Sequence, residues 1–138
     1  MKLRFFIIGL AILFLIGTVS AYDGNFTFPD NYTVTNSSDN YIFMERNQSH
    51  TISISILNSS DKDMLKGLLE RSMYDFTYTR NYTKGDYVVE EDYYNQEYRR
   101  GIVYFCENGD ELIVIDYKVP VIEQVDDSTV AIILDGLD

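Results

Sequence analysis

The sequence predicts an α+β fold built mainly from an antiparallel sheet with two helices. Short runs in which apolar and polar residues alternate predict the strands, and the pair Asn108-Gly109 between two long apolar runs predicts a tight hairpin. Apolar residues recur at helical spacing over 61–74 and again over 127–137, which predicts the two helices. No internal repeat and no flexible linker divides the chain, so we expect one domain.

The first 21 residues have the anatomy of a secretory signal peptide and are set aside from the fold. Lys2 and Arg4 precede an apolar run over 5–16, and a small-residue cleavage pattern ends at Ala21. The run is shorter than the roughly 20 apolar residues of a transmembrane helix, and no later run approaches that length. We therefore expect cleavage after Ala21 and export of residues 22–138 as one secreted domain. An uncleaved N-terminal anchor is the alternative.

Composition and charge exclude several classes of function. The formal charge is −11 and, because two of the eleven basic residues lie in the leader, −13 after cleavage, so the chain has no electrostatic basis for binding nucleic acid. With one histidine, His50, and one cysteine, Cys106, neither an ordinary zinc or copper site nor an intramolecular disulfide can form. No metal or cofactor is expected.

Cys106 is expected to be a small buried hydrophobic residue on a strand, with intermolecular pairing or a reactive thiol as the alternatives. A Cys106–His50 dyad is conceivable, but no nucleophile motif surrounds either residue. The sequence also contains no Gly-rich phosphate loop, no G-x-S-x-G motif and no calcium-binding loop. We therefore predict no catalytic residue.

Six Asn-x-Ser/Thr triplets follow the leader, and in an exported chain such triplets are acceptors for N-linked sugar. They begin at Asn25, Asn31, Asn36, Asn47, Asn58 and Asn81. Strand alternation is the competing explanation at Asn25, Asn31 and Asn81, because the aromatic middle residue would point inward while Asn and Thr share the outer face. Both explanations place the asparagines at the surface, and we expect some of them to carry sugar.

Alternation also predicts the strands of the first half of the chain. Two short strands over 26–28 and 32–34 flank a turn at 29–31, and a third strand covers 41–46. Over 50–57 the isoleucines share one face while Thr and Ser residues share the other. That pattern predicts a half-buried strand with one face in water.

The first helix is predicted over 61–74. Ser60 and Asp63 form an approximate capping box at its start. Its apolar stripe, which we expect to face the core, consists of Met64, Leu65, Leu68, Leu69 and Met73. An exposed stripe would instead indicate a helix that binds a membrane or a partner.

Strands return over 74–83, 85–92 and 98–119, and a two-residue type I′ turn at Asn108-Gly109 makes the last of these a hairpin. The expected pairs are Glu107 with Asp110, Phe105 with Leu112 and Val103 with Val114, and the opposite face carries Ile102, Tyr104, Cys106, Ile113, Ile115 and Tyr117. Because both faces are apolar, we expect this hairpin inside the sheet with a layer on each side.

The C-terminal segment can supply one of these layers. Asp127 is the expected N-cap of a second helix. The residues spaced to form its buried face are Val130, Ile133, Leu134 and Leu137. The β-branched residues of the segment also allow a strand.

The opening phrase aromatic-x-aromatic-Pro-Asp-x-Tyr-x-Val, the Asn-Gly hairpin and the 127–137 helix together support a family resemblance. The matching residues are Phe28, Pro29, Asp30, Tyr32, Val34, Asn108 and Gly109. In element order the chain resembles the Mog1/PsbP-like α/β/α sandwich, and it is similar to small secreted archaeal proteins. Tyr32 stands where that family usually has Trp. The resemblance implies a layered fold but no conserved chemistry, so no catalytic residue is carried over.

The segment 85–101 is the most unusual polar stretch of the chain. Its candidate ligand-binding residues are Glu90, Glu91, Asp92, Tyr93, Tyr94 and Glu97. Carboxylates beside aromatic rings could bind a sugar or a cation, or hydrolyse a glycosidic bond. The alternative is a solvated edge or loop whose charges oppose aggregation.

Taken together, these patterns predict a secreted or cell-surface, N-glycosylated domain that is not an enzyme. We expect a monomer that binds an envelope or extracellular protein or glycan and has no transmembrane helix after cleavage. Two alternatives use the segment Glu90–Glu97: an acid/base enzyme acting on a saccharide, or a carrier of a ligand or cation.

Overall fold

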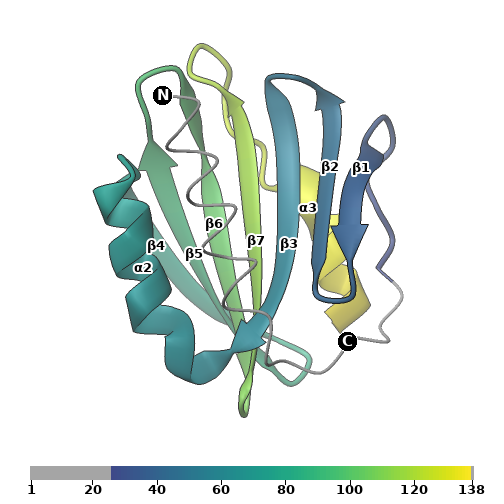
Figure 1. Cartoon of the computed structure of the whole chain (residues 1–138), viewed down its shortest axis with the longest axis vertical. Helices are drawn as coiled ribbons and strands as arrows, with labels where there is room; N and C mark the ends of the chain where they lie inside the picture. Colours follow the sequence, from purple (N-terminus) through teal and green to yellow (C-terminus); the bar gives the residue numbers. More distant parts are fainter. Residues whose placement is uncertain (1–25, 138) are drawn as a thin grey trace.

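The computed structural model describes residues 26–137, which form one antiparallel sheet and two helices. The seven strands of this part of the chain are ordered β1-β2-β3-β7-β6-β5-β4 (Figure 1). They are β1 (Thr33–Ser38), β2 (Tyr41–Asn47), β3 (His50–Asn58), β4 (Asp75–Lys84), β5 (Tyr87–Asn95), β6 (Arg99–Asn108) and β7 (Glu111–Pro120). The predicted α+β class, mainly antiparallel sheet with two helices, is confirmed.

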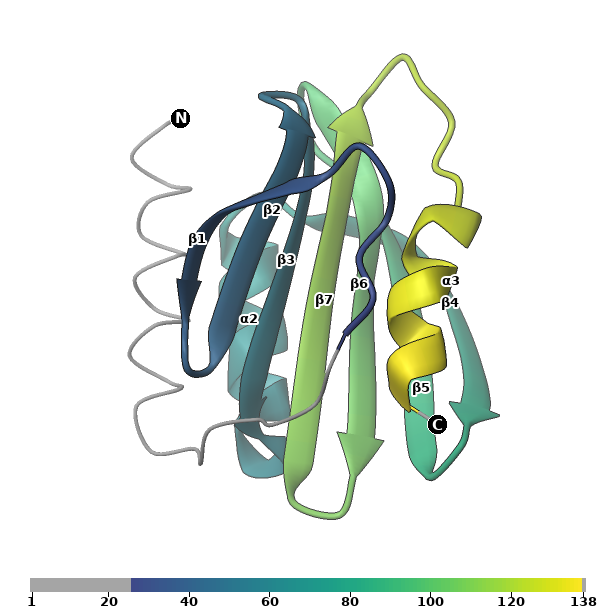
Figure 2. The same cartoon turned by 90° about the vertical axis from the view of Figure 1, so that its right-hand side faces the viewer.

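The two helices lie on opposite faces of the sheet (Figure 1, Figure 2). Helix α2 (Lys62–Arg71) buries Leu65 and Leu69 against one face, which we call the α2 face. Helix α3 (Ser128–Leu134), with a 3-10 turn after it, packs on the other face, which we call the α3 face. The apolar residues of the sheet therefore divide into two cores, one beneath each helix.

The predicted C-terminal helix is confirmed as α3. All four residues expected on its buried face, Val130, Ile133, Leu134 and Leu137, are buried. Asp127 occupies the N-cap position, but its side chain makes no capping hydrogen bond. The carboxylate of Asp126 takes that role, because its Oδ1 accepts a hydrogen bond from the backbone N–H of Ser128 at 3.0 Å.

Strands β6 and β7 lie inside the sheet and are buried on both faces, as predicted. Their register differs from the prediction by two residues, since Phe105 pairs with Val114 rather than with Leu112. The loop is Gly109-Asp110, and Gly109 has a φ of 60°, as a type II′ turn requires at its first central position. Because side chains alternate with a period of two, the shift leaves every residue on its predicted face.

The start of the described chain differs from the prediction. Residues 26–28 form no strand, although Phe26 and Phe28 pack against the core of the α3 face. Edge strand β1 consists largely of residues that the sequence assigned to a polar connection. Asn31 has a φ of 72°, a left-handed turn conformation that interrupts the extended chain just before β1. Pairing with β2, which local patterning does not encode, makes the polar stretch a strand.

The strand predicted over 50–57 is confirmed as β3, but its Thr/Ser face is not in water. Ser55 is only 2% exposed. Strand β3 lies between β2 and β7, where Ser55 is flanked by Tyr41 and Val114. The larger neighbouring side chains shield the small polar ones, so the expected wet face is wrong.

Helix α2 is shorter than the predicted 61–74 and is capped differently. The N-cap residue of α2 is Asp61, whose side chain makes no capping hydrogen bond. The Oδ1 of Asn58 caps the 3-10 turn Ser59–Asp61 before the helix, because it accepts a hydrogen bond from the backbone N–H of Ser60 at 3.0 Å. The apolar stripe is only partly buried: Met64, on the helix, and Met73, beyond its end, are exposed.

Candidate functional site

The acidic segment does not form one site, because β5 is an interior strand between β4 and β6. Alternation places Glu90, Asp92 and Tyr94 on the α2 face, whereas Glu91 and Tyr93 lie on the α3 face. Glu97 lies in the exposed β5–β6 connection. The interpretation of the segment as a solvated edge or loop is also wrong, since Glu91 and Asp92 are only 1% and 2% exposed.

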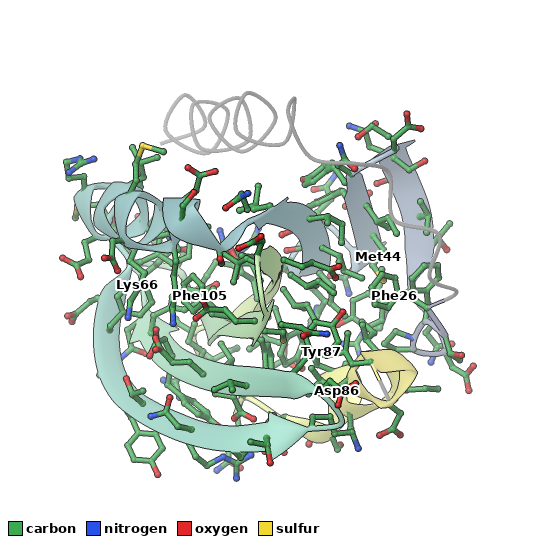
Figure 3. The ribbon with its side chains drawn as sticks, turned by 90° about the horizontal axis from the view of Figure 1, so that it is seen from below. Phe26, Met44, Lys66, Asp86, Tyr87 and Phe105 are labelled. Atoms are coloured by element: carbon green, nitrogen blue, oxygen red, sulfur yellow. The ribbon has the colours of Figure 1, made fainter. Side chains whose placement is uncertain are left out.

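On the α2 face, two lysines of helix α2 neutralise the carboxylates of β5. The Nζ of Lys66 lies 2.7 Å from Glu90, and the Nζ of Lys62 lies 3.2 Å from Glu90 and 2.9 Å from Glu107 on β6. Both ammonium groups lie above the ring of Phe105, as Figure 3 shows for Lys66. These contacts fix the helix to the sheet.

Glu90 and Asp92 share this site as a coupled carboxyl pair. Burial and the hydrogen bond with Glu90 raise the pKa of Asp92 to about 6. Burial alone would raise the pKa of Glu90 too, but hydrogen bonds from Asp92 and Lys66 and the charge of Lys62 lower it to about 2. One proton is therefore held on Asp92 at mildly acidic pH, while Glu90 stays ionised.

We predict that Asp92→Asn makes stability less dependent on pH. The pKa of Asp92 is raised from 3.8 to about 6 by folding, so this group favours the folded state at low pH and loses that contribution as pH rises through 6. The amide of Asn can replace the protonated carboxyl. At pH 8 the free energy of unfolding of the variant should therefore be about 1–3 kcal/mol higher than that of the wild type, and at pH 4 the two values should be nearly equal.

Urea unfolding at the two pH values measures this difference. Glu90→Gln is the matched control on the same strand and face, and it should lower stability at pH 8 because two lysines lose a charged partner. A less stable Asp92→Asn variant at pH 8 would contradict the shared-proton arrangement.

On the α3 face, Glu91 connects the edge strand β4 to helix α3. Its carboxylate lies 2.9 Å from the guanidinium of Arg80 and accepts a hydrogen bond from the Tyr93 hydroxyl at 3.3 Å. Arg80 also lies 3.6 Å from Asp127, at the start of α3. Glu91 is thus an internal ion-pair partner rather than a group that faces a ligand.

Cys106 is buried, as predicted, and burial together with the charge of Glu91 raises the pKa of its thiol to about 12. A raised pKa is the opposite of what a reactive thiol requires. Cys106 pairs with Ile113 of β7, which in turn pairs with Ile56 of β3. Ile56 is six residues away from His50 along β3. That separation is about 20 Å along a strand, so the geometry excludes a Cys106–His50 dyad.

A third polar group, around Asp116 of β7, was missed in the sequence. Its two carboxylate oxygens each accept a hydrogen bond at 2.6 Å, from the hydroxyls of Tyr74 and Tyr94. The Nζ of Lys118 lies 3.8 Å from the same carboxylate and 4.7 Å from the ring of Tyr74. Burial lowers the pKa of Lys118, and the charge of Asp116 opposes that shift. The available signal was an Asp and a Lys two positions apart in an otherwise apolar strand.

Three connections meet at one end of the sheet, the upper end in Figure 1. The guanidinium of Arg99 donates to the carbonyl of Gln48 at 2.9 Å, which joins the β5–β6 and β2–β3 connections. The backbone N–H of Val121 donates to the carbonyl of Tyr98 at 3.0 Å, which joins the β7–α3 connection to them. On this loop-end surface, formed by residues 48–49, 96–98 and 121–124, Tyr98 is 61% exposed and Ile122 is 92% exposed.

His50, buried beside the loop-end surface, supports this arrangement. Its Nε2 lies 2.8 Å from the carboxylate of Glu123, and its Nδ1 lies 2.9 Å from the Oδ1 of Asn47. The imidazole therefore connects the β2–β3 turn to the β7–α3 connection. Together with the Arg99–Gln48 and Val121–Tyr98 hydrogen bonds, it joins the loops that carry the exposed residues.

The predicted sugar acceptors lie at the surface. Within the described chain, the exposed acceptors are Asn31, Asn36, Asn47, Asn58 and Asn81. Asn25 lies outside the described residues. The aromatic middle residues Tyr32 and Tyr82 pack against the core of the α3 face, so the inward-aromatic geometry holds at both triplets. Attachment of sugar stays a prediction.

Residues 26–137 contain one small described cavity and no metal-ligand group. A cavity of about 110 Å³ lies beside the β1–β2 turn, with Phe26, Ile42 and Ile54 in its lining. It is well below the roughly 300–1,000 Å³ of ordinary ligand pockets. In the same residues, His, Cys, Asp and Glu side chains form no group of three or more that could hold a metal ion.

No family model matches the chain, and no curated protein matches it. None of the helices in the described residues combines the length and apolar character that crossing a membrane needs. The assignment of function therefore depends on the geometry of the chain itself.

Proposed function

We propose that this chain is an exported, N-glycosylated, non-catalytic domain of the cell envelope or extracellular space that binds a protein or glycan partner through its loop-end surface. We assign its fold to the Mog1/PsbP-like α/β/α sandwich, because an antiparallel sheet with one helix on each face fits that layering. The leader-like first 21 residues and the exposed acceptor asparagines support export and glycosylation.

The observation that carries the partner role is the exposure of Tyr98 and Ile122 on loops that are tied together by two hydrogen bonds and by the contact between His50 and Glu123. Tyrosine is enriched where binding energy concentrates at interfaces, and ordered loops lose little freedom on binding. Loops on a rigid sheet are also where binding residues most often lie.

The two alternatives find less support. A retaining glycosidase needs two carboxyl groups that are open to substrate, whereas Glu90 is paired with Lys62 and Lys66, and Asp92 is only 2% exposed. A cation carrier needs carboxylates that are open to the ion. Glu90, Glu91 and Asp92 already face lysine or arginine of this chain, so we do not favour either alternative.

We predict that Tyr98→Ala/Ile122→Ala weakens capture of the partner from native envelope extract by at least about tenfold, since interface hot-spot residues contribute 2 kcal/mol or more. The matched control is Tyr78→Ala/Ile132→Ala, which removes an exposed tyrosine and isoleucine from β4 and α3. Pull-down with quantified recovery measures the effect. Equal recovery with both double variants, or no specific capture by the wild type, would overturn the proposal.

A further inference from the structure

The predicted sugar acceptors are not distributed evenly over the sheet. Two of them lie inside strands: Asn36 in β1 and Asn81 in β4. These strands are the two edges of the sheet. In the described chain, the interior strands carry an acceptor only as their last residue, at Asn47 of β2 and Asn58 of β3.

The edges of this sheet have few of the usual protections against strand-to-strand pairing. Natural edges are protected by charged side chains, by proline, by bulges or by short length. Strand β1 contains no charged residue and is exposed throughout. Strand β4 is ten residues long, and its arginine and lysine, Arg80 and Lys84, each lie 2.9 Å from a carboxylate, of Glu91 and of Asp135.

Each edge strand contains one β-bulge, which interrupts its regular pairing. The register shifts between Val34 and Asn36 on β1, and between Phe76 and Tyr78 on β4. The rest of each edge remains regular, with six residues of β4 paired without interruption from Thr79 to Lys84. Tyr78 adds a 60% exposed ring to that edge. Charge and bulges alone therefore leave regular, accessible edge backbone.

We propose that N-linked sugars at Asn36 and Asn81 cover the two sheet edges and prevent them from pairing with a second copy of this chain. The inference rests on the glycosylation in the proposed function. Both asparagines lie on the α2 face, opposite Phe43 of β2 and Glu90 of β5. A pairing strand must approach to about 4.8 Å, and a sugar attached to an exposed residue within the edge strand occupies that space.

The test uses the exported chain purified from its native host, with light scattering after size-exclusion chromatography and intact-mass analysis of each sample. Ser38→Ala/Thr83→Ala abolishes both acceptor triplets while it keeps the asparagines. We expect this variant to have at least twice the monomer mass at concentrations where the wild type is monomeric. Ser38→Thr/Thr83→Ser is the matched control, because it changes the same positions and keeps both acceptors, and it should remain monomeric.

Ser49→Ala removes the acceptor at Asn47, in a turn away from the edges, and should also leave a monomer. Far-UV circular dichroism verifies that each variant is folded, and wild-type chain made in a host without N-glycosylation should associate as the double variant does. A monomeric double variant together with monomeric sugar-free wild type would overturn the inference. Native protein with sugar at Asn31, Asn47 or Asn58 but none at Asn36 and Asn81 would overturn it and leave the proposed function intact. Native protein without any sugar would overturn both the inference and the glycosylation in the proposed function.

Discussion

Replacing Asp116 with Ala is expected to lower the free energy of unfolding by about 3–5 kcal/mol. The carboxylate accepts hydrogen bonds at 2.6 Å from the hydroxyls of Tyr74 and Tyr94, and both of these tyrosines are buried. A buried hydroxyl that loses its acceptor costs about 1–3 kcal/mol. The variant also removes a negative charge that lies 3.8 Å from the buried ammonium of Lys118.

Chemical denaturation at pH 7 measures the loss, with Asp75→Ala as the matched control. Asp75 is exposed at the start of β4, so its replacement should change stability by less than about 0.5 kcal/mol. Asp116→Asn keeps one acceptor oxygen and should be intermediate. In a Tyr74→Phe/Tyr94→Phe background, Asp116→Ala should cost clearly less, because no hydroxyl then loses an acceptor. The same cost in both backgrounds would contradict the hydrogen-bonding role.

Gly101→Ala is expected to destabilise the fold by at least about 3 kcal/mol. Gly101 lies on β6 with no strained φ, so the reason is steric rather than conformational. A Cβ there would collide with the backbone carbonyl of Tyr117 and would lie 2.8 Å from the hydroxyl of Tyr94. That hydroxyl passes over Gly101 to reach Asp116, so the substitution disturbs the same hydrogen bonds.

Gly67→Ala on helix α2 is the control. It replaces a glycine by alanine at a position without a steric clash, so it shows whether the loss of stability at Gly101 comes from the clash. Its Cβ would meet only the flexible end of Arg71, at 3.4 Å, and Ala favours the helix by up to about 1 kcal/mol. The two glycine variants should therefore shift the thermal midpoint in opposite directions. A Gly101→Ala variant whose thermal midpoint, measured by circular dichroism, is not lowered would show that the tight contact at Gly101 is absent.

Local patterning was a reliable guide wherever apolar residues decide the structure. The β6–β7 hairpin, the isoleucine face of β3 and the four buried residues of α3 follow from periods of two or 3.6 residues, and all were predicted. The register of the hairpin was not predicted, because Asn108-Gly109 and Gly109-Asp110 are both acceptable turn pairs. Because side chains alternate every two residues, each residue lies on the same face of the sheet in either register. The prediction of which residues are buried was therefore correct.

Patterning failed where polar residues meet distant partners. Strand β1 is polar throughout and forms only by pairing with β2. The carboxylates of 90–92 read as a solvated edge, but β5 is covered by α2, β4 and α3 residues from elsewhere in the chain. Lys62, Lys66 and Arg80 supply the compensating positive charges, and none of them is adjacent to β5 in sequence.

The fold class, the elements with apolar periodicity and the exposure of the acceptor asparagines in residues 26–137 could be predicted from local patterns, because they depend on residue spacing and on the exclusion of apolar surface from water. The burial of Glu91 and Asp92 on opposite faces, and the hydrogen bonds from two tyrosines to Asp116, follow from the packing of distant elements and could not be predicted. The same packing also decided which asparagines lie on the sheet edges. Strand order and long-range ion pairs arise from contacts between residues far apart in the chain, and the spacing of neighbouring residues does not predict such contacts.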